Sequence, residues 1–196
     1  AHVGNYLPTM RPGTDYRQLY AAKRSEGGGV VLDAIHEIDY LMWLFGPVVA
    51  AGCQAGRLSD LEIDTEAHAV IALKHGSGVV CSAELDYLRK FKSRGCEIIG
   101  DHGVLHWQSD GKQPERCRVR LYRDAAGKWD VLTAIDEVDT ASPYARVMEE
   151  FIGAISGTDS GLLLTVDTAA RELRVALTAL RSAAARGQEL AVAIGS

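Results

Sequence analysis

The side chain in this sequence best suited to chemistry is His36. It lies between Asp33 and Asp39 in a run whose polar and apolar residues separate onto two faces at helical periodicity. Imidazole exchanges protons near neutral pH, and a neighbouring carboxylate fixes its tautomer. The spacing therefore predicts a helix over 32–45 with His36 as general acid or base and Asp33 as its partner. Asp39, also one turn away, could take the partner role. The competing interpretation is an ordinary amphipathic helix with a structural His–Asp pair.

A second group of polar residues precedes this helix, and a third lies near residue 88. Arginine suits a carboxylate or phosphate, whereas tyrosine and aspartate suit sugar hydroxyls. We predict that these side chains bind the substrate, and the competing interpretation is a surface loop with ordinary salt bridges. The residues are Arg11, Asp15, Tyr16, Arg17, Tyr20, Tyr87 and Arg89, and Asp39 of the predicted helix is expected to bind the substrate with them.

The remaining histidines and the cysteines predict structural roles. His75 and His102 are expected to be exposed turn residues, and His68 and His106 to lie in strands. No H-E-x-x-H pattern occurs, so no metal site is expected. The four cysteines lack C-x-x-C spacing and are expected to be reduced thiols on strands of a cytoplasmic protein.

Length and composition predict a single domain over 1–196. The chain is 47% hydrophobic and 24% charged, close to globular averages. A net charge of −5 argues against binding to nucleic acid. No apolar run approaches the length of a membrane span, and no signal peptide is visible.

The patterning predicts an α+β fold: a large, mainly antiparallel sheet covered on one face by helices. The second face must meet another domain or another copy, because an apolar sheet face is not stable in water. Segments 69–73 and 78–81 lack polar alternation, which predicts burial on both sides. The expected strands are 2–7, 48–57, 67–74, 78–85, 93–100, 104–108, 118–123 and 128–134. The expected helices are 32–45, 143–156 and 165–186.

The run Gly27-Gly28-Gly29, Asp33, His36, Asp39 resembles the helix that opens the substrate-binding half of the Gfo/Idh/MocA oxidoreductases. One departure is the three-residue gap from Asp33 to His36, where family members usually have four. Segments 4–20 and 85–103 are similar to a subgroup that serves surface-polysaccharide and sialic-acid-type sugar clusters.

The resemblance implies the C-terminal substrate-binding and dimerisation domain of a sugar dehydrogenase. The family's N-terminal Rossmann domain binds NAD or NADP, and neither its G-x-G-x-x-G fingerprint nor its Glu-Lys-Pro motif occurs here. By the same resemblance, Gly28 and Gly29 would contact the cofactor, and the open sheet face would make a homodimer. The chain alone is not expected to be catalytically competent. Two alternatives remain: a non-catalytic sugar-binding scaffold, and a cofactor-independent epimerase that uses His36.

Overall fold

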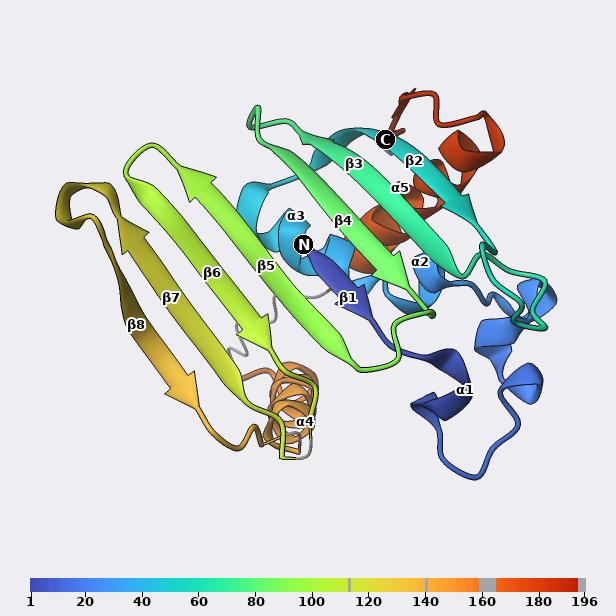
Figure 1. Ribbon diagram of the computed structural model, residues 1–196, viewed down its shortest axis with the longest axis horizontal. Coiled ribbons are helices and arrows are strands. Elements are labelled where there is room, and N and C mark those ends of the chain that lie inside the picture. Colours follow the sequence, from blue (N-terminus) through green and yellow to red (C-terminus); the bar gives the residue numbers. More distant parts are fainter. Residues whose placement is uncertain (113, 140, 159–164, 194–196) are drawn as a thin grey trace.

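A single large sheet organises the computed structural model, which describes residues 1–112, 114–139, 141–158 and 165–193. Its nine strands lie in the order β8-β7-β6-β5-β1-β4-β3-β2-β9 (Figure 1). The strands are β1 (His2–Gly4), β2 (Val48–Gly56), β3 (His68–His75), β4 (Val80–Asp86), β5 (Ser93–Gly100), β6 (Gly103–Ser109), β7 (Cys117–Arg123), β8 (Lys128–Ile135) and β9 (Leu190–Ala191). The β1–β4 pair is parallel and the other described pairs are antiparallel, which confirms the predicted fold class.

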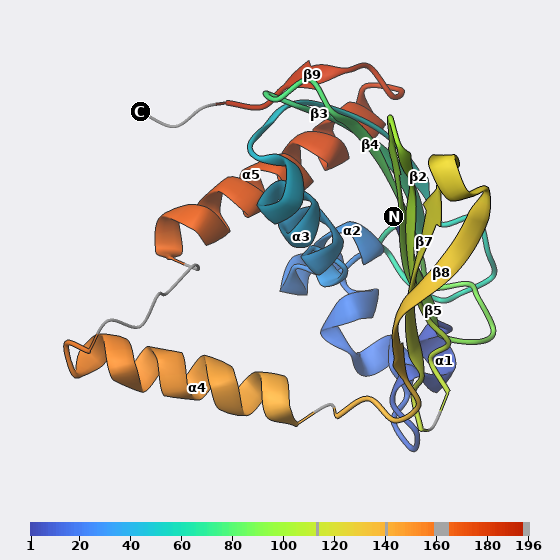
Figure 2. The same cartoon turned by 90° about the vertical axis from the view of Figure 1, so that its left-hand side faces the viewer.

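Helices lie on one face of this sheet, as Figure 2 shows edge-on. They are α1 (Leu7–Met10), α2 (Val30–Asp33), α3 (His36–Phe45), α4 (Ser142–Ile155) and α5 (Val166–Ala184). The Thr165 side chain caps α5 by accepting a hydrogen bond from the backbone N–H of Thr168. Gly187 follows with φ of 85°, a left-handed conformation that glycine adopts without strain.

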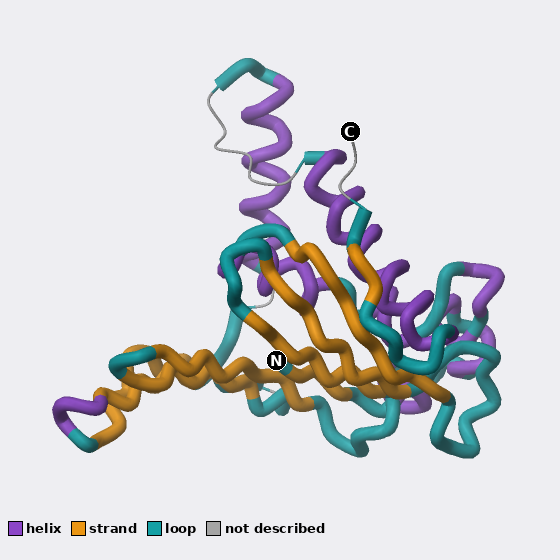
Figure 3. Tube along the Cα trace, turned by 90° about the horizontal axis from the view of Figure 1, so that it is seen from above, coloured by secondary structure: helices purple, strands orange, loops and turns teal. Residues whose placement is uncertain are grey.

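The core lies between the helices and strands β2, β3 and β4. Along β3, Ala69, Ile71 and Leu73 are fully buried, whereas Val70 and Lys74 are exposed. Within one chain only the helix-covered face of this strand is closed, and its other face, which carries Val70, is exposed. Figure 3 shows that the β7–β8 end of the sheet extends beyond the helices.

Two predicted elements have different bounds in the structure. The first strand stops at Gly4, and Pro8 then occupies the first turn of α1, where proline is tolerated. The helix predicted over 32–45 begins at Val30 instead and is interrupted after Asp33. Ala34, with φ −98° and ψ 26°, ends the first segment, and His36 is the first residue of the second.

The prediction that His75 is an exposed turn residue is wrong. His75 is the last residue of β3 and is buried, and its Nδ1 lies 2.7 Å from the carbonyl oxygen of Gly46. Its ring meets that of Phe45 edge-on at 5.7 Å. The His75 side chain therefore links the C-terminal end of α3 to the sheet through these two contacts. His102 is exposed and His68 and His106 lie on strands, as predicted.

Within the described residues, no helix combines the length and apolarity that crossing a bilayer requires. The four cysteines are free and lie on strands, as predicted for Cys53, Cys81, Cys96 and Cys117.

Candidate functional site

Asp33, at the end of α2, accepts hydrogen bonds from two tyrosine hydroxyls. Tyr87 donates to Asp33 Oδ2 at 3.0 Å, and Tyr20 donates to Oδ1 through a short hydrogen bond. The bond to Asp33 raises the pKa of Tyr20 to about 12, with a further contribution from partial burial, while the charge of Arg11 opposes the rise. The structure thus brings Tyr20 and Tyr87, two predicted site residues, together at the Asp33 carboxylate, although it does not bond Asp33 to His36.

His36 begins α3, and its nearest carboxylate is Glu37. Its Nε2 lies 3.3 Å from Glu37 Oε1, and Arg94 Nε from β5 donates to the same oxygen at 2.6 Å. The Glu37 side chain is fully buried, whereas about half of the His36 side chain is exposed. The Arg94 guanidinium also lies 5.4 Å from the Trp107 ring centroid. We call His36, Glu37 and Arg94 the His36 cluster.

The surroundings of His36 favour its neutral form. Burial lowers the pKa of His36 below its ordinary 6.5, and the charge of Arg94 lowers it further. The charges of Asp33 and Asp39 act in the opposite direction. At neutral pH the imidazole is therefore able to accept a proton. Burial raises the pKa of Glu37, and Arg94 opposes that rise.

The third carboxylate of the predicted trio, Asp39, faces α5. It bonds Glu172, whose pKa is raised to about 7 by burial and by the charge of Asp39. Both line a cavity of about 460 Å³ between α3, α4 and α5, together with Tyr40 and Trp43. Asp39 acts on His36 through its charge.

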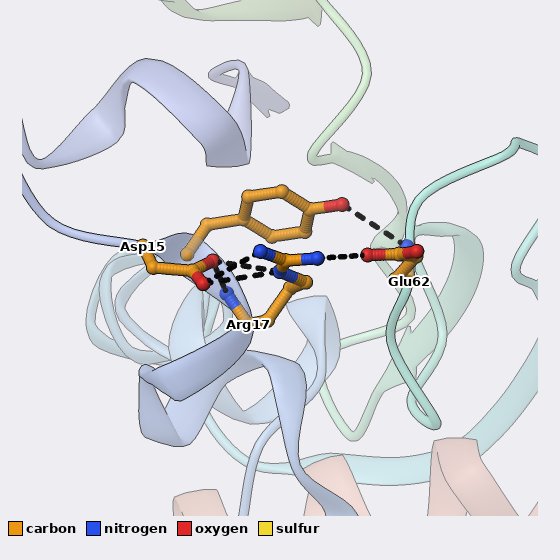
Figure 4. Close-up of polar contacts among 4 residues, drawn as sticks. Asp15, Arg17 and Glu62 are labelled. Atoms are coloured by element: carbon orange, nitrogen blue, oxygen red, sulfur yellow. Dashed lines mark hydrogen bonds and ion pairs between the residues drawn. The ribbon is translucent and has the colours of Figure 1, made fainter.

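Three predicted substrate-binding residues instead bind one another and a neighbouring loop. Arg17 forms ion pairs with Asp15 at 2.8 Å and with Glu62 at 2.7 Å, as Figure 4 shows. The Glu62 backbone N–H donates to the Tyr16 hydroxyl at 3.2 Å. The Arg17 guanidinium therefore already has carboxylate partners, and this group connects loop 11–20 with loop 57–66.

Arg89, like Arg17, already forms ion pairs with carboxylates. It pairs with Asp86 at 3.0 Å and with Glu84 at 3.1 Å. Arg89 and Glu84 line a cavity of about 630 Å³ beside β1. Arg89 is thus held by two carboxylates of β4, whereas Tyr87 donates to Asp33.

The glycines before α2 pack against the chain itself. A Cβ on Gly28 would lie 2.1 Å from the Tyr20 carbonyl oxygen, and one on Gly29 would lie 2.2 Å from Glu66 Oε1. Glu66 Oε1 also accepts from the Val31 backbone N–H at 3.2 Å. The helix N-terminus that was expected to face the cofactor is therefore closed by a buried carboxylate.

Glu37, Arg94 and Glu66 are the site residues that sequence reasoning missed. The available signal in the sequence was Arg94, a charged residue inside a predicted strand. In the sheet, Arg94 lies opposite Val3 on one neighbouring strand and Ser109 on the other. A partly buried cation on the core side of the sheet requires an acidic partner, and the buried Glu37 supplies it.

With this geometry established, the comparisons with known proteins identify the family. Residues 1–106, more than half of the chain, match the GFO/IDH/MocA C-terminal domain. The chain belongs to the GFO/IDH/MocA family. This confirms the family resemblance carried by the glycine run, Asp33, His36 and Asp39. No curated protein matches the chain.

Solved structures of several oxidoreductases share the fold. The aldose-aldose oxidoreductase from Caulobacter crescentus, in complex with glycerol, is 16% identical with a TM-score of 0.73, covering 97% of this chain and 55% of its own. The WlbA dehydrogenase from Bordetella pertussis, in complex with NADH and UDP-GlcNAcA, is 19% identical with a TM-score of 0.67, covering 99% and 54%. An NAD binding oxidoreductase from Klebsiella pneumoniae is 14% identical with a TM-score of 0.76, covering 99% and 58%. This GFO/IDH/MocA chain therefore spans little more than half the length of these proteins.

Proposed function

We propose that this chain is the substrate-binding half of an NAD(P)-dependent oxidoreductase that oxidises a hydroxyl of a sugar or sugar derivative. The observation that carries the proposal is His36, a half-exposed and mainly neutral imidazole at the start of α3. Oxidation of a hydroxyl requires a base for the O–H proton while the hydrogen on carbon leaves as hydride. An imidazole whose pKa lies below 6.5 accepts that proton at neutral pH.

The neighbouring groups have distinct parts in this proposal. Glu37 and Arg94 position the imidazole from its buried side. Asp33 supports the protonated imidazole by its charge and holds the Tyr20 hydroxyl, which is available to a sugar oxygen because Tyr20 is exposed. Among the described residues, Arg11, whose charge acts on Tyr20, is the predicted substrate-binding arginine that forms no ion pair with a carboxylate.

The cofactor does not fit the glycine run of this chain. Gly28 and Gly29 are filled by the Tyr20 carbonyl and by Glu66, and the Glu66 carboxylate would repel a pyrophosphate. We infer that NAD or NADP is held by a companion domain, so that the hydride acceptor comes from outside this chain. Proton transfer and substrate binding are the parts that belong to it.

The relatives support a sugar as substrate. One is an aldose-aldose oxidoreductase, and another was solved with NADH and UDP-GlcNAcA. Tyrosine, aspartate and arginine around Asp33 suit hydroxyl and carboxylate groups. The assignment to sialic-acid-type sugar clusters remains part of this proposal.

The proposal is tested with two proteins: the 196-residue chain, and the longer polypeptide in which it is joined to its cofactor-binding half. We expect titration calorimetry to detect no NAD⁺ or NADP⁺ binding to the chain alone. The longer protein should reduce one of the two cofactors when an aldose or a UDP-linked uronic acid is the substrate. The absorbance of the reduced cofactor at 340 nm measures this reaction.

The same experiment separates the alternatives. Deuterium uptake into the sugar from D₂O without any nicotinamide would favour the cofactor-independent epimerase. Sugar binding without turnover in the longer protein would favour the scaffold. Micromolar binding of NAD⁺ to the chain alone would contradict the proposal that a companion domain holds the cofactor.

We further propose that two copies assemble through the open face of the sheet. Val70, Val80 and Ile99 lie on that face and are 44%, 71% and 77% exposed. We expect the chain to sediment at tens of micromolar as a species of twice 21.1 kDa, and Ile99→Lys to make it monomeric. Phe91→Lys, at an exposed position in the loop before β5, is the matched control and should leave the dimer intact. A wild-type chain that sediments only as a monomer would refute this assembly.

A further inference from the structure

The hydrogen bonds among Tyr20, Asp33 and Tyr87 have a fixed direction. A tyrosine hydroxyl carries one hydrogen, and each of these two hydroxyls donates its hydrogen to Asp33. The bonds end on different carboxylate oxygens, Oδ1 for Tyr20 and Oδ2 for Tyr87. Because an ionised carboxylate only accepts, each phenol oxygen is left with the capacity to accept a hydrogen bond. We call these three residues the Asp33 cluster.

Tyr20 is the member of the Asp33 cluster whose phenol oxygen a ligand can reach. Tyr20 is 41% exposed, whereas Tyr87 is 1% exposed. The hydrogen bond to Asp33 and partial burial raise the pKa of Tyr20 to about 12, so the phenol keeps its hydrogen at neutral pH. The Asp33 charge disfavours a carboxylate or phosphate at the Tyr20 oxygen, and such a group fits better at Arg11. A neutral group that donates a hydrogen bond therefore suits Tyr20.

The glycine run holds Tyr20 in place. The Tyr20 carbonyl oxygen packs so closely on Gly28 that an added Cβ would lie 2.1 Å away, so this approach requires glycine. The Gly29 backbone N–H donates to the Ala21 carbonyl oxygen at 3.1 Å. The turn that carries Tyr20 is thus fixed to the start of α2, and Asp33 is the last residue of that helix. An acceptor positioned in advance costs less entropy to engage when a ligand binds.

We propose that Tyr20 determines specificity by accepting a hydrogen bond from one hydroxyl of the sugar. This inference rests on the proposed function, because that function places the substrate at His36, on which the Asp33 charge acts. The hydroxyl that is oxidised gives its hydrogen to His36, so Tyr20 binds a second hydroxyl of the same sugar. A sugar that lacks this hydroxyl, or that carries a group unable to donate there, binds more weakly.

The test replaces the hydroxyls of a sugar one at a time by fluorine, because a C–F group cannot donate a hydrogen bond. The probes are D-glucose, an aldose of the class proposed above, and its 2-, 3-, 4- and 6-fluoro derivatives. Fluorine NMR measures the affinity of the longer polypeptide for each derivative without nicotinamide, and competition gives that for D-glucose. We expect at least one replacement to weaken binding about three- to tenfold, the usual contribution of a neutral hydrogen bond.

Tyr20→Phe identifies the hydroxyl that Tyr20 binds. In this variant one replacement that weakens binding to the wild-type protein should change the affinity by less than about twofold, because the acceptor is gone. The loss at the hydroxyl that donates to His36 should persist. Tyr122→Phe, at a tyrosine on β7, is the matched control and should keep every loss seen in the wild type.

The proposal is overturned if fluorine is tolerated at all four positions, if every loss persists in Tyr20→Phe, or if no sugar binds. Reduction of NAD⁺ or NADP⁺ is followed separately. A Tyr20-dependent loss without reduction of either cofactor would refute the proposed function and leave the hydroxyl-binding role of Tyr20 standing. Sugar-dependent reduction without a Tyr20-dependent loss would do the reverse.

Discussion

Replacement of His36 by alanine is expected to lower kcat of the intact oxidoreductase by about 10²- to 10⁴-fold, the usual contribution of a general acid or base. The fold should tolerate the change, because alanine is the better helix former and about half of the His36 side chain is exposed. His102→Ala is the matched control, since His102 lies exposed in the turn after β5. Cofactor affinity and the unfolding midpoint should change little in either variant. Turnover near the wild-type rate in His36→Ala would remove the assigned base.

The pH dependence of the wild-type enzyme gives a second readout of the same residue. Burial and Arg94 hold the pKa of His36 below 6.5, so the imidazole stays neutral and basic down to mildly acidic pH. In the direction of hydroxyl oxidation, kcat/KM should be constant near pH 7 and fall only as the pH drops below 6.5. The acidic limb should be absent from the residual activity of His36→Ala. A limb well above 6.5 would mean that another group titrates.

Most of the sheet could be predicted because its signals are local. The observed bounds of β5 are those predicted, 93–100, and the other hairpin strands differ by one or two residues. Turn residues and β-branched runs mark strand ends without knowledge of the fold. The interruption of the predicted helix has no such mark, because Ala34 and Ile35 are ordinary helix residues. Hydrophobic periodicity reports which side is buried and is insensitive to a break in the hydrogen-bond ladder.

The residue types of the site could be named from the sequence in part, but the partner of His36 could not. Asp33, Tyr20 and Tyr87 were all named from their types, and they meet in the fold. The partner of His36 was not predicted, since Arg94 lies 57 residues beyond Glu37 and their contact depends on sheet register. Spacing alone favoured Asp33, and the break after that residue turns its carboxylate toward the tyrosines. Long-range pairing of charges is what one sequence does not encode in a local pattern.

The Arg94–Glu37 pair leads to the second large effect. Arg94→Met is expected to destabilise the chain by about 3–5 kcal/mol, because it leaves a buried carboxylate without its cation. Arg94 is the donor to Glu37 Oε1, and Glu37 Oε2 has no hydrogen-bond partner among the described residues. A loss of that size is a large part of the roughly 5–15 kcal/mol that stabilises a typical domain. Arg123→Met removes an exposed ion pair with Asp130 and should cost less than about 1 kcal/mol.

The double variant Glu37→Met/Arg94→Met should recover most of this loss, since a buried ion pair can be replaced by apolar groups at little net cost. The loss in Arg94→Met should also depend on pH. Burial raises the pKa of Glu37 in the folded state, and Arg94 opposes the rise, so its removal raises that pKa further. The folded state then binds a proton more tightly than the unfolded state, and stability falls as the pH rises from the unfolded pKa through the folded one. Urea unfolding near pH 7 and near pH 5, followed by tryptophan fluorescence, should therefore show a smaller loss at the lower pH. A loss below about 1 kcal/mol at both pH values would mean that the pair does not hold α3 against β5.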